Sequence, residues 1–265
     1  MIPAITPTER ASRAGLKLFA GLVLVFLMAP VLVIIPLSFN AEPYFTYPMP
    51  GWSTRWYEAI FTGPEWRTAL FNSVVVATAA TALATSLGTL AALGLSRRDF
   101  PARGLVMGVL ISPMVVPLVI TAVGIYFFYA RIGLAHSLTG LVVAHTVLAT
   151  PFVVITVTAA LSKLDVRLPQ AAASLGAPPR LVFWRVTFPL ILPGVLSGAL
   201  FAFVTSFDEV VVVLFLAGPE QRTLPRQMWS GIREQISPAI LALATLLTLL
   251  SICLLATVEW LRKPR

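Results

Sequence analysis

Two adjacent carboxylates, Asp208 and Glu209, are the only acids placed well inside a long apolar run of this 265-residue chain. A charged side chain at the centre of a bilayer costs about 2.5–3.5 kcal/mol on insertion scales, so such residues usually face an interior or a water-filled path. Adjacent residues of a helix point about 100° apart, so we expect Asp208 to face a pathway and Glu209 to bind a neighbouring helix or subunit. An acid on such a path would attract a cation. The alternative is that both carboxylates hydrogen-bond helices together at a seam between subunits.

Aromatic residues form a second candidate set for the same pathway. Tyr126 and Tyr129 lie near the end of the apolar run 104–130, and eight more aromatic residues gather in the segment 44–66. The faces of aromatic rings can hold ammonium groups, which makes Tyr126 and Tyr129 candidates for lining a cation path. Tyr and Trp are also enriched where a membrane meets water, and this interfacial role explains the same residues more simply.

Residues for catalysis, metal binding or nucleotide binding do not form a recognisable pattern. His136 and His145 are nine residues apart without an H-E-x-x-H motif, and the single cysteine, Cys253, lies in an apolar run. None of the three lysines follows a glycine, so the phosphate-binding motif G-x-x-x-x-G-K-[ST] is missing from the sequence. We therefore expect a chain that is not an enzyme and that binds no metal or cofactor. If ATP and Mg²⁺ drive its work, a separate ATPase subunit must use them.

The composition indicates a membrane protein. Hydrophobic residues make up 58% of the chain, charged residues only 11%, and the mean hydropathy is +0.89, whereas about a quarter of a soluble domain is charged. A membrane span needs about 20 apolar residues. The sequence predicts an all-α fold, a single transmembrane domain over residues 1–265, with spans at about 16–38, 69–95, 104–130, 138–161, 189–217 and 239–261.

The basic residues orient these spans. If the N-terminus is cytoplasmic, thirteen of the nineteen Lys and Arg fall in inner segments and six in outer ones, as the positive-inside rule requires. The thirteen are Arg10, Arg13, Lys17, Arg97, Arg98, Arg103, Lys163, Arg167, Arg180, Arg185, Arg262, Lys263 and Arg265. Both termini are therefore predicted to face the cytoplasm, and the segment 163–188 becomes the longest inner loop.

That inner loop carries helix signals and a mixed surface. Pro169 suits the first turn of a helix, Gly176 suits the position just past its end, and Pro179 can start a second short helix that runs to Pro189. Exposed apolar residues beside Arg180 and Arg185 would give the loop a surface that a solvated connection does not need. The sequence therefore predicts two short helices that dock on another protein.

This loop resembles the cytoplasmic signature of permease subunits of bacterial ABC importers, which reads Glu-Ala-Ala, three residues, Gly, nine residues, Ile, one residue, Leu-Pro. Ala171, Ala172, Gly176 and Pro189 match at the right spacing, while Gln170 stands where the family usually has Glu. The segments "GWSTRWYEAIFTGPEWRTALFNSVVVA" and "SFDEVVVVLFLAGPEQRTLPRQMWSGIREQISPAILALATLL" look like parts of the spermidine/putrescine type of this family. The likeness thus extends over most of the chain.

The resemblance implies a polytopic helical bundle of the MetI-like fold and a place in an importer of small cationic solutes such as polyamines. In this family the loop forms coupling helices that seat in a groove of the ATPase, which assigns Gln170, Ala171, Ala172, Gly176 and Arg180 to ATPase coupling. The implied partners are a second permease subunit, two ATPase subunits and a periplasmic solute-binding protein, in the bacterial inner membrane. The outer loop 218–237, with a short helix from Pro225, is a candidate surface for the binding protein.

Other functions stay open at this point. Related permeases carry 4-aminobutyrate, opines or other small amino compounds, so the cargo could be one of these. An intramembrane enzyme would need facing catalytic groups, and Asp208 and Glu209 are poorly placed for that because they are adjacent on one helix. A stand-alone channel would not need the docking loop.

Overall fold

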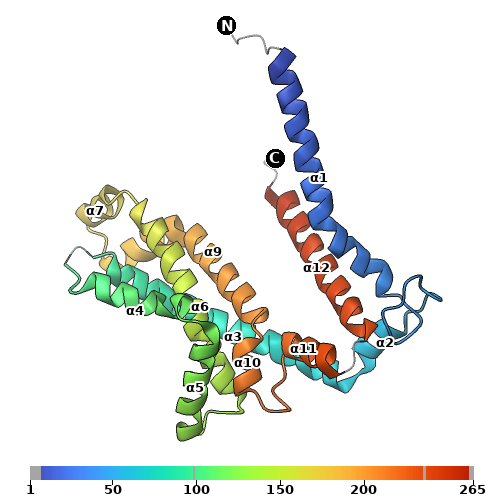
Figure 1. Cartoon of the computed structure of the whole chain (residues 1–265). Coiled ribbons are helices and arrows are strands. Elements are labelled where there is room, and N and C mark those ends of the chain that lie inside the picture. The colour runs from blue at the N-terminus through green and yellow to red at the C-terminus, as the bar shows by residue number, and fades with distance from the viewer. Residues whose placement is uncertain (1–6, 98, 235–236, 263–265) are drawn as a thin grey trace. The chain divides into compact units, whose positions relative to one another are not determined.

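The computed structural model describes residues 7–97, 99–234 and 237–262. These residues form helices joined by loops, and an isolated bridge between Asn40 and Trp52 is the only strand-like pairing among them (Figure 1). The all-α class expected from the sequence is confirmed. Three of the basic residues used to orient the chain lie outside the described residues: Arg98, Lys263 and Arg265.

Packing divides the chain into two compact units, of which the larger runs from Pro64 to Trp229. Its helices are α3 (Pro64–Leu95), α4 (Arg103–Val115), α5 (Leu118–Ile132), α6 (Leu138–Ser162), α7 (Arg167–Ser174), α8 (Pro179–Val182), the π-helical turn η1 (Phe183–Thr187), α9 (Phe188–Phe207), α10 (Val211–Leu216) and the first part of α11 (Leu224–Glu234).

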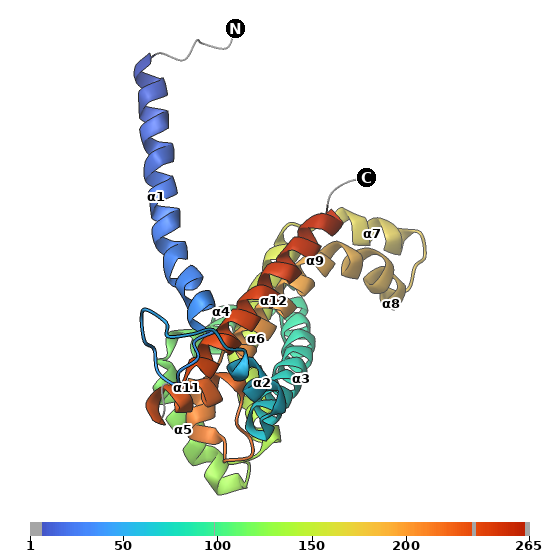
Figure 2. The same ribbon diagram turned by 90° about the vertical axis from the view of Figure 1, so that its right-hand side faces the viewer.

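The centre of this unit is the packing of α3, α6 and α9 against one another (Figures 1 and 2). Their contact surface is built from small and β-branched side chains, namely Ala84, Ala92, Ala149, Val153, Val157, Ile191, Val195 and Ala202. Glycines lie in the same contacts: a Cβ on Gly88 would stand 2.7 Å from the Cβ of Val153. Small residues let apolar helices approach closely and gain van der Waals contact, which is how helices associate in lipid.

A second core in the same unit joins α5, α6 and α10. It contains Tyr129, Leu141, Leu148, Val213 and Leu216, all buried. The loop between α5 and α6 is tied to the end of α10, because the His136 N–H donates to the Leu216 carbonyl at 2.9 Å. This core holds the short helix α10 in place.

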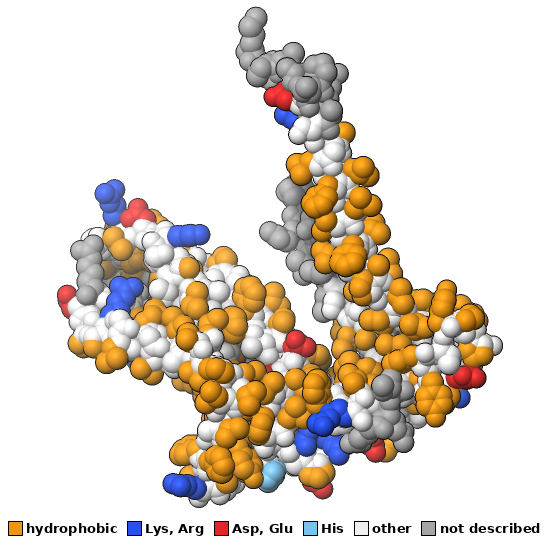
Figure 3. Space-filling model, in the orientation of Figure 1, with side chains coloured by type: hydrophobic (Ala, Val, Ile, Leu, Met, Phe, Trp, Pro, Cys, Tyr) orange, Lys and Arg blue, Asp and Glu red, His pale blue; other side chains and the backbone are white. Residues whose placement is uncertain are grey.

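The smaller unit comprises the segments up to Gly63 and from Ser230 onward. It holds α1 (Pro7–Leu37), α2 (Arg55–Thr62) and α12 (Pro238–Arg262); α12 packs against both α1 and α2. The Ser237 hydroxyl accepts the Ala239 N–H at 3.2 Å, so Ser237 caps α12 and Pro238 lies in its first turn. Hydrophobic side chains are exposed along α1 (Figure 3), among them Leu22, Phe26 and Leu32.

Within the described residues, four segments are long and apolar enough to cross a membrane: Ser12–Leu37, Pro64–Leu95, Leu138–Ser162 and Pro179–Phe207. The pair α4 and α5 passes the same test together but is bent by 103°. The bend lies at Val116 and Pro117, which are both extended (ψ 132° and 127°), because a residue before proline is pushed out of the helical region. The segment 104–130, expected as one span, is therefore formed by two helices that meet at a sharp bend, and α12 adds a shorter apolar helix over Pro238–Cys253.

Candidate functional site

The break between α9 and α10 contains both acids, Asp208 and Glu209. The helix α9 ends at Phe207, the Asp208 N–H still donates to the Val204 carbonyl at 3.0 Å, and α10 begins at Val211. The run 189–217, expected as one continuous span, is thus interrupted at the acids themselves. Because the break lies beside α5 and α6 rather than at a chain end, its free backbone groups need partners inside the bundle.

Glu209 supplies those partners. Both oxygens of its carboxylate accept the Val212 N–H, at 2.9 and 3.0 Å, and Oε2 also accepts the Val213 N–H at 3.3 Å. A carboxylate at a helix N-terminus satisfies donors that lack intrahelical acceptors and complements the helix dipole. Glu209 is only 7% exposed. Glu209 was expected to bind a neighbouring helix or subunit; its hydrogen bonds instead go to backbone N–H groups three and four residues ahead in its own chain.

His145 of α6 completes the buried cluster. Its Nδ1 lies 2.8 Å from the Ser206 hydroxyl on α9, and its Nε2 lies 3.8 Å from Glu209 Oε2. The histidine and Glu209 side chains are 0% and 5% exposed. His145, Ser206 and Glu209 therefore connect α6, α9 and the start of α10 through polar groups within an apolar core.

Asp208 has a different environment from its neighbour. Its side chain is exposed, and its carboxylate makes no hydrogen bond or ion pair with any residue that the structure describes. Ser197 and Val204 are also exposed on α9, 11 and 4 residues earlier, which places them within about 40° of Asp208 around the helix axis. One exposed face of α9 thus leads to a single unpaired carboxylate at the break.

The two candidate tyrosines lie in different surroundings. Tyr129 is 5% exposed within the core of α5, α6 and α10. Tyr126 is half-buried, with its ring edge-on to His136 at 6.3 Å and to Phe127 at 5.7 Å. Both contribute to packing around α5; their assignment to a solute pathway stays a prediction.

The inner loop has the local structure that its proline and glycine residues predict. The Ala177 N–H donates to the Ala172 carbonyl and the Gly176 N–H to the Ala173 carbonyl, at 3.2 and 2.9 Å, while Gly176 has φ +85°. These are the two hydrogen bonds of a Schellman motif, which closes α7 with a left-handed residue that favours glycine. The predicted helix end at Gly176 and the second helix start at Pro179 are confirmed.

The second helix does not stop at Pro189. It passes from α8 through the π turn η1, where the Phe188 N–H reaches back to the Phe183 carbonyl, and continues as α9. Proline has no N–H and its ring clashes with the carbonyl of the preceding turn; the wider π turn accommodates Pro189 without ending the helix. The loop is therefore joined directly to the helix that leads to Asp208.

The loop surface is apolar and basic. Leu175 is 89% and Trp184 61% exposed, and Gln170, Ala171 and Arg180 are exposed while Ala172 is half-buried. Trp184 lies edge-on to Phe183 and Phe188, each at 5.1 Å between ring centroids. Large exposed apolar side chains gathered on one surface mark a contact site for another protein or for the membrane.

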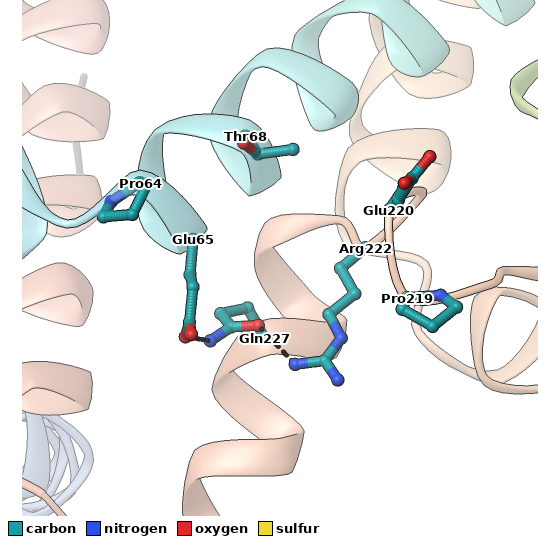
Figure 4. Close-up of a pocket in the computed structure, with 7 residues that line it drawn as sticks. All are labelled: Pro64, Glu65, Thr68, Pro219, Glu220, Arg222 and Gln227. Atoms are coloured by element: carbon teal, nitrogen blue, oxygen red, sulfur yellow. Dashed lines mark hydrogen bonds between the residues drawn. The ribbon is translucent and has the colours of Figure 1, made fainter.

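A pocket of about 390 Å³ lies between the start of α3 and the segment that leads into α11 (Figure 4), lined by Pro64, Glu65, Thr68, Pro219, Glu220, Arg222 and Gln227. The Gln227 amide donates to Glu65 Oε2 at 3.2 Å and accepts from Arg222 at 3.4 Å. Asn72 donates to the carbonyls of Glu220 and Arg222, at 2.8 and 2.9 Å, so α3 holds one wall of the pocket in place. The short helix predicted from Pro225 is confirmed as α11, which begins one residue earlier.

Sequence reasoning missed the cluster of His145, Ser206 and Glu209. It found no metal or catalytic motif around His145 and named no partner for its ring. The available signal was thermodynamic: an imidazole and a carboxylate in two different apolar runs each need a polar partner in lipid.

Comparisons with known proteins identify the family. Residues 84–263 match the family model of the binding-protein-dependent transport system inner membrane component. The chain is 33% identical over 236 residues, 89% of its length and 91% of the relative, to the spermidine/putrescine transport system permease protein PotC of Haemophilus influenzae. It is 35% identical over 232 residues, 84% of its length and 81% of the relative, to the putrescine transport system permease protein PotI of Escherichia coli.

Solved structures share the fold. A chain of a bacterial ABC transporter involved in the import of the acidic polysaccharide alginate superposes with a TM-score of 0.76 at 13% identity, covering 99% of this chain and 100% of that one. An amino acid ABC transporter superposes with a TM-score of 0.58 at 18% identity, covering 77% and 96%. The expected MetI-like permease fold is confirmed, and so is the expectation of a transport subunit rather than an enzyme. From the family match over residues 84–263 and the identity to both permeases, this chain belongs to the binding-protein-dependent transport system inner membrane components.

Proposed function

We propose that this chain is one permease subunit of an ATP-driven importer that moves a polyamine, such as spermidine or putrescine, into the cytoplasm by alternating access. The observation that carries the proposal is the exposed, unpaired carboxylate of Asp208 at a helix break within an apolar bundle. An isolated anion there attracts an ammonium group strongly, because the low-dielectric surroundings screen the attraction less than water does.

The names of the relatives support the same cargo. Both permeases reported above belong to systems that transport spermidine or putrescine. These solutes carry several ammonium groups, and Asp208 offers the charge that such a group needs. Tyr126 and Tyr129 are assigned to the same path by this proposal, through the affinity of aromatic rings for ammonium groups.

The partners follow from the surfaces of the chain. The exposed apolar loop from α7 to η1 would seat in an ATPase subunit, with Gln170, Ala171, Ala172, Gly176 and Arg180 at the contact. Two ATPase subunits, which use ATP and Mg²⁺, a second permease subunit and a periplasmic solute-binding protein would complete the complex. The outer loop 218–237, which includes the pocket residue Arg222, is the surface assigned to the binding protein.

The proposed orientation places both termini and the α7–η1 loop in the cytoplasm. The basic side chains of Lys163, Arg167, Arg180 and Arg185 all lie on or beside this loop, as expected for a segment that stays inside. Cysteine accessibility checks it: a cysteine at Ser174 should react with an impermeant thiol reagent only after the membrane is opened.

The test is solute-stimulated ATP hydrolysis by the complete complex in proteoliposomes. The binding protein is supplied with spermidine, putrescine, 4-aminobutyrate or an opine in turn. We expect stimulation by the polyamines and little by the others; stimulation by 4-aminobutyrate alone would reject the polyamine assignment.

Variants of Asp208 test the site within that complex. Asp208→Asn should raise the half-maximal polyamine concentration about tenfold, the equivalent of about 1.4 kcal/mol, while Asp208→Glu, which keeps the charge, should raise it much less. Subunit stoichiometry after purification is the control for assembly. An unchanged half-maximal concentration in Asp208→Asn would remove Asp208 from the pathway.

A further inference from the structure

The imidazole of His145 contacts two polar groups from two different elements. One ring nitrogen, Nδ1, is 2.8 Å from the Ser206 hydroxyl on α9, and the other, Nε2, is 3.8 Å from the carboxylate of Glu209 in the break. Nε2 is buried and has no hydrogen-bond partner among the described residues. The ring therefore lies between the Ser206 hydroxyl, with which it forms a hydrogen bond, and the Glu209 carboxylate, with which it forms none.

The arrangement selects one tautomer of a neutral ring. With a proton on Nε2, the Nε2–H dipole points at the Glu209 carboxylate, and Nδ1 accepts a hydrogen bond from the Ser206 hydroxyl. With the proton on Nδ1 instead, the lone pair of Nε2 would face an oxygen of Glu209 that already accepts backbone N–H groups. Two lone pairs facing each other repel in a buried site, so the first tautomer is favoured.

The carboxylate that the ring faces decides the structure of the break. The residue before α10, Val210, has no side-chain cap of its own, and the N–H groups of Val212 and Val213 are satisfied by Glu209 alone. If Glu209 turned outward, α10 would lose its cap and two like charges would stand on neighbouring exposed residues. Keeping Glu209 inward leaves one acid, Asp208, to face outward.

We propose that His145 is a positioning residue for transport: the N–H dipole of Nε2, 3.8 Å from Oε2 of Glu209, favours the inward position of that carboxylate in the cap of α10, and the cap fixes the break so that Asp208 alone faces the cargo. Ser206 orients the ring because its hydroxyl donates a hydrogen bond to Nδ1. This inference rests on the proposed function, because it gives His145 a role in cargo affinity through Asp208. His145 itself does not touch the cargo.

The first experiment observes the tautomer directly. The chain has two histidines, and His136→Asn leaves His145 as its only one; asparagine tolerates the positive φ of 56° at that position. With ¹⁵N-histidine introduced into this subunit alone before assembly with unlabelled partners, we expect a directly bonded proton on Nε2 and an unprotonated, hydrogen-bond-accepting Nδ1. A proton on Nδ1 with Nε2 bare would overturn the proposal, and this measurement needs no substitution at position 145.

The second experiment separates the two nitrogens by substitution. Asparagine places a hydrogen-bonding atom near the position of Nδ1, and glutamine places an amide N–H near that of Nε2. His145→Asn should raise the half-maximal polyamine concentration roughly tenfold, and His145→Gln should restore most of the affinity. The change should fall on the half-maximal concentration rather than on the maximal rate, a split that a general packing defect would not produce.

A matched control lies next to His145. Thr146 is also buried, but its hydroxyl donates only to the Val142 carbonyl of its own helix, at 2.7 Å. Thr146→Val replaces a hydroxyl of α6 by a methyl group of similar size without touching the break, and the half-maximal concentration should stay unchanged. Equal effects of His145→Asn and His145→Gln, or an equal effect of Thr146→Val, would show that His145 serves packing alone.

The outcome for Asp208 keeps the two proposals apart. If Asp208→Asn raises the half-maximal concentration and the asparagine variant of His145 does not, the positioning role fails while the proposed function stands. If Asp208→Asn has no effect, the proposed pathway fails, whatever the tautomer of His145.

Discussion

Gly198 of α9 and Thr156 of α6 approach so closely that a Cβ on Gly198 would stand 2.5 Å from the Thr156 hydroxyl oxygen and 3.0 Å from the Cα of Val153. The Thr156 hydroxyl cannot readily turn away, because it donates to the carbonyls of Phe152 and Val153, at 2.9 and 3.1 Å. The contact between α6 and α9 therefore depends on the absence of a side chain at position 198.

Substitution of this glycine should separate the two helices. Gly198→Ala should destabilise the bundle by about 1–3 kcal/mol, the usual cost of overpacking a filled core, and should lower the midpoint of thermal unfolding in detergent. Gly124→Ala on α5 is the matched control, because nothing lies within 4 Å of a Cβ there. Equal midpoints for the two variants would contradict the close packing described above.

Gly176 should be replaceable by asparagine but not by alanine. Its φ of +85° is in the left-handed region, where a side chain costs roughly 1–2 kcal/mol and asparagine is tolerated best. Gly176→Ala should weaken the Schellman motif that ends α7 and reduce binding of the ATPase subunit about fivefold or more. Binding of the purified permease to the ATPase, measured by titration, checks this.

The asparagine variant serves as the control for Gly176. It should recover most of the binding, since it keeps the left-handed residue between α7 and α8. If the alanine and asparagine variants bind the ATPase equally, the conformation of Gly176 does not control the coupling surface.

Gln170→Glu should strengthen the contact with the ATPase. The side chain is exposed on α7, and a carboxylate makes hydrogen bonds about twice as strong as those of an amide, a gain of about 1 kcal/mol or roughly fivefold in affinity. The measurement is the same titration, repeated at high salt, where the gain should shrink. A weaker complex would mean that the groove of this ATPase is built for the amide.

Asn72→Ala should loosen the wall of the outer pocket. The amide of Asn72, which is 3% exposed, donates to the carbonyls of Glu220 and Arg222, and the loss of one intramolecular hydrogen bond costs about 0.5–1.5 kcal/mol. We expect faster proteolysis between Pro219 and Thr223. Thr68 lines the same pocket, and its side chain makes no hydrogen bond with the described residues. Thr68→Ala should therefore leave the cleavage rate unchanged.

The sequence by itself determined the lipid environment, the helical class and the two short helices of the loop 163–188. Long apolar runs report the lipid environment, because a membrane span needs about 20 predominantly apolar residues whatever it packs against. The end of α7 at Gly176 and the start of α8 at Pro179 followed from local chemistry: glycine can enter the left-handed region, and proline fits the first turn of a helix.

Only the tertiary structure decided where the apolar runs break and which acid faces outward. Asp208 and Glu209 have the same charge and the same apolar neighbours, and the 100° between adjacent helical residues separates the two side chains without showing which one finds partners. The environments of the two acids differ because the partners lie on the side of Glu209. These partners are the N–H groups at the start of α10 and the ring of His145, which is 64 residues earlier in the chain. A buried polar group takes the direction of its partners, and partners from another helix are brought into place only when the helices pack.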